Sequence, residues 1–97
     1  MSIKKQSMIT IDVSSINTSQ ELHLLLKEAL ELPNFYGENW DAFWDAITGL
    51  IELPVKIEFI GWESLEAKLP SDANVLLVCL NDFNEEFPDE RRDFLFH

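Results

Sequence analysis

The chain is short and strongly acidic: 97 residues carry 18 Asp and Glu against 7 Lys and Arg, a formal net charge of −11. Such a field repels nucleic-acid phosphates and anionic membranes and attracts basic partners, which argues against binding to nucleic acid or a membrane surface. The charge alone is equally compatible with solubility and no special partner. The length predicts a single domain over residues 1–97.

The compartment is indicated by three features of the sequence. The single Cys79 cannot form an intramolecular disulfide, so the fold does not depend on an oxidising compartment. The start, MSIKKQSMITIDV, has two lysines but no continuous apolar run like that of a signal peptide. No stretch approaches the roughly 20 apolar residues of a membrane span. We therefore expect a cytoplasmic protein.

In chain order, a strand and a helix come first. Residues 8–13 (MITIDV) alternate apolar and polar positions, which predicts a strand. A helix is predicted to follow, because Thr18 and Glu21 fit a capping box, and Pro33 is expected to end it. The apolar stripe of this helix comprises Leu22, Leu25, Leu26 and Ala29.

The rest of the chain continues the alternation of helices and strands. A loop at 33–37 precedes a second predicted helix from about Asn39 to Gly49, whose glycine is a plausible C-terminal stop. Residues 54–60 predict a strand, 62–69 a short helix and 91–97 a final strand. Residues 74–80 (NVLLVCL) fit either a buried strand or the core of a helix over about 71–86. This order predicts an α/β domain with a parallel sheet.

The second predicted helix has two unlike faces. The core face follows the helical i, i+3, i+4, i+7 spacing and consists of Trp40, Phe43, Trp44 and Ile47. The opposite face gathers acids and small residues, namely Asp41, Ala42, Asp45, Ala46 and Gly49. Between Glu28 and Val55 there are six carboxylates and no Lys or Arg to pair with them. Like charges four residues apart destabilise a helix, so the pattern favours an incoming cation or basic surface over a face that is acidic by chance.

The loop before this helix carries two adjacent aromatic residues, Phe35 and Tyr36. Gly37 is expected to allow a sharp turn after them. An aromatic residue beside an acidic helix face has the composition of an interface anchor. We expect Phe35 to fold back over the core, whereas for Tyr36 both orientations stay open.

The same acids raise the alternative of a divalent-metal-dependent hydrolase, because carboxylates are suitable ligands for hard cations. The spacing of Asp41 and Asp45 is not that of an EF-hand loop, and neither His23 nor His97 has the company of a zinc ligand. No nucleotide-binding loop, nucleophile elbow or C-x-x-C motif is present. We therefore expect no catalytic residues, no metal site and no cofactor, and a protein that is not an enzyme.

The segment LELPNFYGENWDAFWDAITG resembles the barstar-like family of ribonuclease inhibitors. The shared pattern L-P-x-x-Y-G-x-N-x-D-A-x-W-D-x-x-T-G is met by Leu32, Pro33, Tyr36, Gly37, Asn39, Asp41, Ala42, Trp44, Asp45, Thr48 and Gly49. The resemblance implies a small three-stranded parallel sheet packed by about four helices, which assigns residues 74–80 to a long fourth helix. Departures are Phe35, where the family often has Tyr, and Ala46, where barstar has Cys. The Leu53–Pro54 bond matches a position that is cis in the family.

The resemblance also implies a role. The loop and second helix would plug the active site of a basic, barnase-like ribonuclease, with Asp45 in the place of an RNA phosphate and Asp41 paired with a neighbouring basic group. Tyr36 or Phe35 would pack against the catalytic histidine. Partner-binding residues would be Phe35, Tyr36, Gly37, Asn39, Asp41, Ala42, Asp45, Thr48, Gly49 and, on the fourth helix, Asp82 or, with a one-residue slip, Asn81.

The expected partner is therefore a basic ribonuclease or toxin protein, bound one to one by a chain that is monomeric when free. The first alternative is an acidic interaction or immunity module that uses the same face for a different basic toxin or regulator. The metal-dependent hydrolase is the second. The acids alone do not distinguish the first alternative from a ribonuclease inhibitor, because they would look the same in both.

Overall fold

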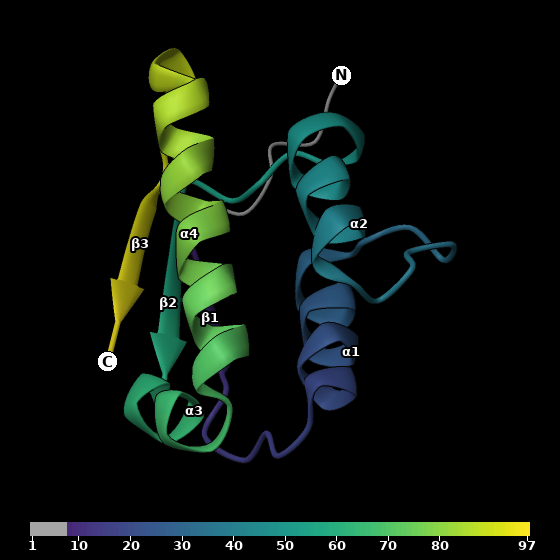
Figure 1. The fold of residues 1–97 in the computed structure, drawn as a ribbon. Coiled ribbons are helices and arrows are strands. Elements are labelled where there is room, and N and C mark those ends of the chain that lie inside the picture. Colours follow the sequence, from purple (N-terminus) through teal and green to yellow (C-terminus); the bar gives the residue numbers. More distant parts are fainter. Residues whose placement is uncertain (1–7) are drawn as a thin grey trace.

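A three-stranded parallel sheet forms one layer of the molecule (Figure 1). The structure is a computed structural model that describes residues 8–97. The strands β1 (Met8–Asp12), β2 (Lys56–Ile60) and β3 (Asp93–Phe96) lie in chain order, so β2 is the central strand. The strands predicted at residues 8–13, 54–60 and 91–97 are confirmed, and so is their parallel arrangement.

The two faces of the sheet differ in burial. Ile57 lies opposite Ile9 of β1 and Phe94 of β3, and this row points into the core together with the fully buried Ile11 and Phe59. The alternate positions point the other way and are exposed or half-buried; they include Thr10, Glu58 and Leu95. Because side chains alternate along a strand, one face of the sheet carries the core and the other faces solvent.

Four α-helices and two shorter helical turns complete the α/β fold within residues 8–97. They are α1 (Ser19–Leu30), α2 (Trp40–Asp45), the π-helical turn η1 (Ala46–Leu50), α3 (Trp62–Lys68), α4 (Pro70–Glu86) and the 3₁₀ turn η2 (Pro88–Glu90). Residues 74–80 lie inside α4, so the helix implied by the family resemblance is confirmed and the strand alternative is excluded. Buried Leu76, Leu80 and Phe83 follow the helical spacing that turns this long helix toward the core.

The first helix begins and ends as its sequence indicates. Thr18 Oγ1 accepts a hydrogen bond from the Glu21 N–H at 3.1 Å, while the Glu21 carboxylate accepts from the Asn17 N–H at 2.8 Å rather than from Thr18 itself. Leu22 and Leu26 are fully buried against the core. The helix ends at Glu31, whose φ of 55° places it in the left-handed region just before Pro33.

Three further expectations concern the chain as a whole. The Leu53–Pro54 bond is trans, as are all peptide bonds of residues 8–97, so the match to a cis position does not extend to this chain. Within the same residues no helix is long and apolar enough to cross a membrane. The prediction of one domain covers residues 1–97, of which 1–7, the lysine-containing start, lie outside the described residues.

Candidate functional site

The helix that carries the acidic face begins with a side-chain cap. Asn39 precedes α2 in an extended conformation, and its Oδ1 accepts a hydrogen bond from the Ala42 N–H at 2.7 Å. This cap fixes the first turn, so Asp41 and Asp45 project one turn apart from the same side of the helix. Both carboxylates are exposed, and the half-buried Ala42 lies beside them.

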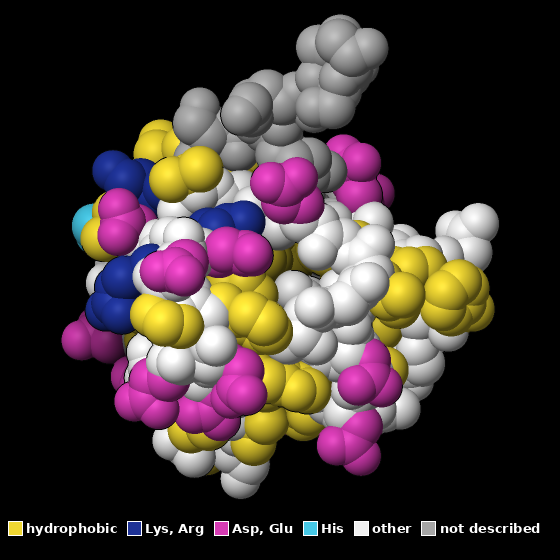
Figure 2. All heavy atoms as spheres, turned by 90° about the horizontal axis from the view of Figure 1, so that it is seen from above, with side chains coloured by type: hydrophobic (Ala, Val, Ile, Leu, Met, Phe, Trp, Pro, Cys, Tyr) yellow, Lys and Arg dark blue, Asp and Glu magenta, His cyan; other side chains and the backbone are white. Residues whose placement is uncertain are grey.

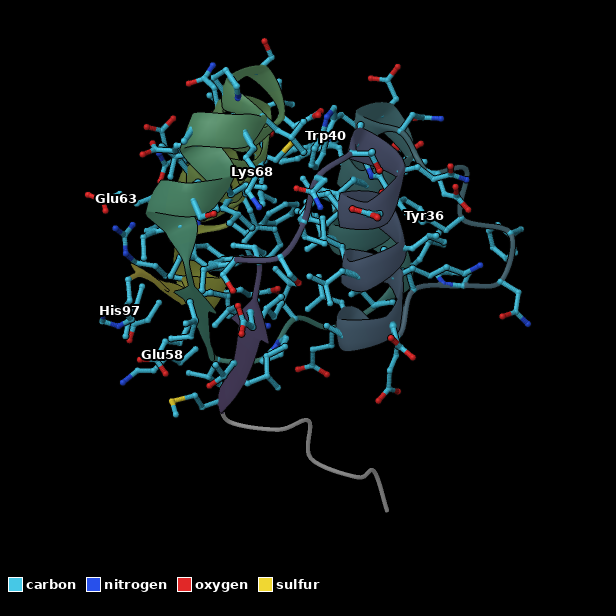
Figure 3. All side chains as sticks on the ribbon, turned by 90° about the horizontal axis from the view of Figure 1, so that it is seen from below. Tyr36, Trp40, Glu58, Glu63, Lys68 and His97 are labelled. Carbon is cyan, nitrogen blue, oxygen red and sulfur yellow. The ribbon has the colours of Figure 1, made fainter. Side chains whose placement is uncertain are left out.

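Neither carboxylate has a cationic partner among residues 8–97. The one ion pair in this part of the chain joins His97 Nε2 and Glu58 at 2.9 Å. That pair lies on the opposite side of the molecule from Tyr36 and Trp40 (Figure 3). In the view of Figure 2 the visible Lys and Arg side chains gather on one side of the molecule, together with acidic side chains, and none is seen on the other side, where hydrophobic and uncharged atoms lie with a few acids. Within residues 8–97, Asp41 and Asp45 therefore form no ion pair.

The opposite face of α2 packs into the core as predicted, with one correction. Phe43 and Ile47 are buried and the rings of Trp40 and Trp44 are half-buried against the same cluster. Ala46, expected on the acidic face, is only 1% exposed. At about 100° per residue, Ala46 lies only about 60° around the helix from Phe43, so it belongs to the edge of the core face.

The helix does not stop at Gly49 but widens into the π-helical turn η1. The Ile51 N–H donates to the Ala46 carbonyl at 3.0 Å, five residues back, and Thr48 Oγ1 donates to the Trp44 carbonyl at 2.7 Å. Gly49 has no left-handed φ, and a Cβ built on it would meet nothing within 4 Å. Neither the backbone conformation nor the packing within residues 8–97 therefore requires a glycine at position 49.

The loop before α2 turns at a different residue from the one expected. Glu38, with φ of 57°, adopts the left-handed conformation, whereas Gly37 does not. Gly37 is instead held close to the capping residue: the Asn39 Nδ2 donates to the Gly37 carbonyl at 3.2 Å, and an added Cβ would lie 3.2 Å from the same nitrogen. The glycine thus makes room for the Asn39 side chain.

The two aromatic residues of this loop have orientations that the sequence analysis did not anticipate. Phe35, expected over the core, is 78% exposed, so that prediction is wrong. Tyr36, left open, is buried, with its hydroxyl 2.5 Å from His23 Nδ1 and 3.5 Å from the Asn39 carbonyl. The Tyr36 N–H also donates to the Pro33 carbonyl at 2.9 Å. The buried His23 ring needs a hydrogen-bond partner, and of the two aromatic residues only Tyr36 has a hydroxyl that can provide one. Tyr36 therefore faces the core, and Phe35 faces solvent.

His23 on α1 contacts the loop from the core side, through Tyr36, and was not among the site residues predicted from the sequence. Its ring is 2% exposed and lies 4.3 Å from the Trp40 ring, whose Nε1 donates to Asp72 Oδ1 of α4 at 3.0 Å. Burial lowers the pKa of His23, against the opposing charges of Asp72 and Glu38. Burial also raises the pKa of Tyr36 far above its usual range.

A small apolar hollow adjoins the acidic face. Its volume is about 170 Å³, and it is lined by Pro33, Phe35, Tyr36, Gly37, Ala42, Asp45, Ala46 and Leu50. Leu50, 53% exposed, and Phe35 stand out beside it as large apolar side chains in contact with solvent. Asp45 therefore presents its charge at the rim of an apolar surface, a combination typical of protein interfaces.

Asp82 of α4 is exposed. The Cys79 thiol, half-buried on the same helix, has a pKa raised by burial first and then by the charges of Asp82 and Asp41. Both carboxylates thus lie within electrostatic range of one sulfur, although they come from different helices. Asn81 is exposed as well. No group of three or more His, Cys, Asp or Glu within residues 8–97 is arranged to hold a metal ion.

A family model described as "Barstar (barnase inhibitor)" matches residues 6–97. The chain belongs to the barstar family. A curated protein of Bacillus subtilis (strain 168), named "Putative ribonuclease inhibitor YrdF", is 35% identical over 82 residues, which are 84% of this chain and 90% of that protein. The names given to the family and to this relative describe inhibitors, so the chain's place is among inhibitors and not among enzymes.

Proposed function

We propose that this protein inhibits a basic, barnase-like ribonuclease by inserting its docking face into the active site. The docking face comprises the loop and helix residues Phe35, Tyr36, Gly37, Asn39, Asp41, Ala42, Asp45, Thr48 and Gly49, with Asp82 of α4 at its edge. The observation that carries the proposal is the exposure of Asp41 and Asp45 one turn apart, with no ion-pair partner for either within residues 8–97. Family membership supports a ribonuclease as the class of target.

The roles that we assign to individual residues are supported by their surroundings and by the family resemblance. Asp45, beside the apolar hollow, takes the place of an RNA phosphate among the enzyme's cationic side chains, and Asp41 and Asp82 pair with basic groups at its edge. Phe35 is the aromatic contact, since its ring already faces solvent. Tyr36 and Asn39 act mainly by fixing the conformation of the loop and of the first turn of α2, Tyr36 through His23 and Asn39 through the Ala42 N–H. Gly49 lets the enzyme approach the helix closely.

The mechanism is occlusion and needs no cofactor or turnover. One docking face fills one active site, so inhibition is one to one, and the free protein is a monomer. Opposite charges steer the encounter, and this steering is screened beyond roughly 8–10 Å at physiological ionic strength, so association slows as salt is added. The same logic makes the protein an immunity factor that protects the cytoplasm in which it is made.

The test is a competition experiment with a basic ribonuclease of this class. The protein should abolish RNA cleavage at one equivalent, and a mononucleotide bound in the active site should slow formation of the complex because both need the same phosphate site. Inhibition that is unaffected by saturating mononucleotide would contradict occlusion. Capture of a basic protein without ribonuclease activity, together with no inhibition, would favour the alternative of an interaction module for another toxin or regulator.

A further inference from the structure

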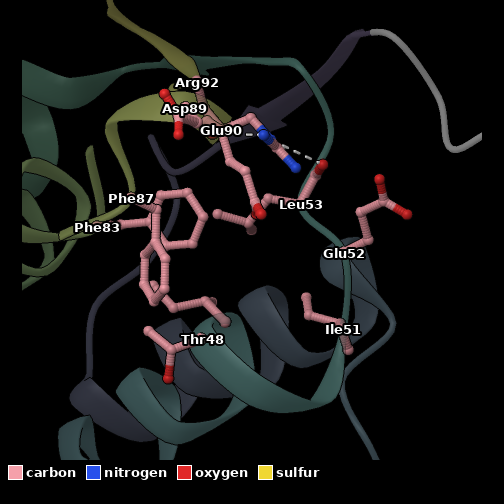
Figure 4. A pocket seen from close by; sticks show the side chains of 10 residues that line it. Thr48, Ile51, Glu52, Leu53, Phe83, Phe87, Asp89, Glu90 and Arg92 are labelled. Atoms are coloured by element: carbon pink, nitrogen blue, oxygen red, sulfur yellow. Dashed lines mark hydrogen bonds between the residues drawn. The ribbon is translucent and has the colours of Figure 1, made fainter. Parts of the chain in front are cut away.

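A second hollow lies beside the docking face, between η1 and the C-terminal end of α4 (Figure 4). Its volume is about 470 Å³. The lining residues are Ile47, Thr48, Ile51, Glu52, Leu53, Phe83, Phe87, Asp89, Glu90 and Arg92. We refer to this hollow as the Phe83 pocket. Figure 4 shows the two phenylalanine side chains on one side of it and Ile51 and Glu52 on the other.

The Phe83 pocket combines an aromatic wall with an acidic rim. Phe83 is buried and Phe87 half-buried, and their rings pack 5.1 Å apart. Glu52, Asp89 and Glu90 are exposed, and none of the three has an ion-pair partner within residues 8–97. Apolar stems with a charged tip, as in Lys and Arg, are suited to such surroundings, because the stem covers the rings and the tip reaches the carboxylates.

The pocket already accommodates one guanidinium, which shows that this chemistry fits. Arg92 lies with its Cζ 5.8 Å from the centre of the Phe83 ring, and its Nε donates to the Leu53 carbonyl at 3.1 Å. Its Nη1 donates to the backbone carbonyl of Glu90 at 2.5 Å. Arg92 is thus held by backbone carbonyls, while the three side-chain carboxylates of the rim remain available to a second cation.

The pocket is continuous with the docking face through Thr48. This residue belongs to the docking face, three positions after Asp45, and also lines the Phe83 pocket. A partner that covers Asp45 with an interface of ordinary size, about 800 Å² on each protein, is therefore expected to reach the pocket mouth. The charge of the rim is complementary to the basic partner that the docking face requires, so the same partner is the occupant that both surfaces fit.

We propose that the Phe83 pocket receives a Lys or Arg side chain of the same ribonuclease, at the periphery of its contact with the docking face. The stem packs on Phe83 and Phe87, and the cation lies among Glu52, Asp89 and Glu90. This assignment rests on the proposed function and adds a second site that holds the complex together once it has formed.

The experiment compares two double variants with equal loss of charge. Glu52→Gln/Glu90→Gln alters the pocket, and Glu63→Gln/Glu66→Gln removes the same charge from α3, at the opposite end of α4 (Figure 1). Association and dissociation rates with the ribonuclease are measured for each variant and for the wild type. A lost long-range attraction lowers the association rate in both variants alike, whereas a lost local contact raises the dissociation rate of the pocket variant alone.

We expect dissociation of the pocket variant to be about 5- to 20-fold faster than that of the wild type, since each partly exposed pair contributes only modestly. The α3 variant should dissociate at the wild-type rate. Equal dissociation rates for all three proteins would overturn the pocket and leave the proposed function intact. A wild type that neither binds nor inhibits the ribonuclease would overturn both.

Discussion

The Tyr36 hydroxyl lies 2.5 Å from Nδ1 of His23, a side chain that is 2% exposed. This contact joins the loop that carries the docking face to α1, and the tilted contact of the Trp40 ring with the same imidazole extends it to α2. Buried polar atoms that share a hydrogen bond are costly to separate, because each one left behind loses its partner without regaining water. The loop is therefore held from inside by one residue pair.

The first prediction concerns this pair. Tyr36→Phe should lower the free energy of unfolding by about 1–3 kcal/mol, because it leaves His23 Nδ1 buried without a partner. The adjacent Phe35→Ala is the matched control and should change stability by no more than about 0.5 kcal/mol, since the Phe35 ring is exposed. Urea unfolding of both variants measures this. Equal losses would mean that the two aromatic residues do not divide their roles as the structure indicates.

The second prediction concerns pH. Burial lowers the pKa of His23 in the folded protein, so in the pH range just below its ordinary value of about 6.5 the unfolded chain binds more protons than the folded one. Acidification through this range should therefore destabilise the protein, and the loss should level off only below the folded pKa. Unfolding midpoints measured between about pH 8 and pH 5 test the sign.

His23→Gln supplies the control for the pH experiment. It keeps a polar side chain beside Tyr36 but has no imidazole to protonate, so the fall in stability just below the ordinary histidine pKa should become shallower than in the wild type. His97→Gln, which removes the exposed histidine, should preserve the steep part of the wild-type curve. If His97→Gln flattens the curve and His23→Gln does not, the pH dependence arises from His97, and the prediction for His23 is wrong.

The third prediction separates stability from function at Gly49. A Cβ on Gly49 would meet nothing within 4 Å, and the residue lies in a helical turn, so Gly49→Ala should stabilise the protein by about 0.4–1 kcal/mol. Binding should nevertheless weaken, because the added methyl group keeps the enzyme from the helix. Thermal melts and inhibition assays on one preparation test both. A variant that is stabilised and inhibits as well as the wild type would remove Gly49 from the docking face.

Gly61 provides the contrast for that experiment. It adopts φ of 79°, and a Cβ there would lie 2.4 Å from the Ser14 Cβ. Gly61→Ala should therefore destabilise the fold, in opposition to Gly49→Ala, because the left-handed backbone and the Ser14 contact both exclude a side chain.

The fourth prediction concerns the core face of α2. Phe43 is fully buried, so Phe43→Ala should cost about 3–5 kcal/mol, a large part of the stability of a small domain. The half-buried Trp44 should be less costly to truncate, because part of its ring is already in contact with solvent. Circular dichroism melts of the two variants give the order. A Trp44→Ala variant less stable than Phe43→Ala would contradict it.

The order of helices and strands was predictable because each element carries its own local signal. Thr18, Asn39 and the alternation of β1 act within a few residues, so a single sequence contains them. The long helix α4 was ambiguous, because an apolar run is equally suited to a buried strand, and only the resemblance to a family selected the helix.

The inner support of the site was not predictable in the same way. His23 and Tyr36 are 13 residues apart, and no local pattern states that their side chains meet. The choice between Phe35 and Tyr36 depended on that distant imidazole. A signal was nevertheless present, because at about 100° per residue His23 lies about 20° from the buried Leu30 and so faces inward from α1. An inward histidine predicts a buried hydrogen-bond partner elsewhere in the chain.

The central claim is that Asp45 binds the active site of a ribonuclease, and its most direct test is the inhibition of RNA cleavage by Asp45→Asn. The substitution preserves shape and removes one charge, and Glu66→Gln on α3 removes one charge far from the docking face. The account predicts that Asp45→Asn folds with wild-type stability yet loses inhibition by at least about 100-fold, as for a charge-assisted contact at the centre of an interface, while Glu66→Gln inhibits normally. Equal inhibition by both folded variants would contradict the claim.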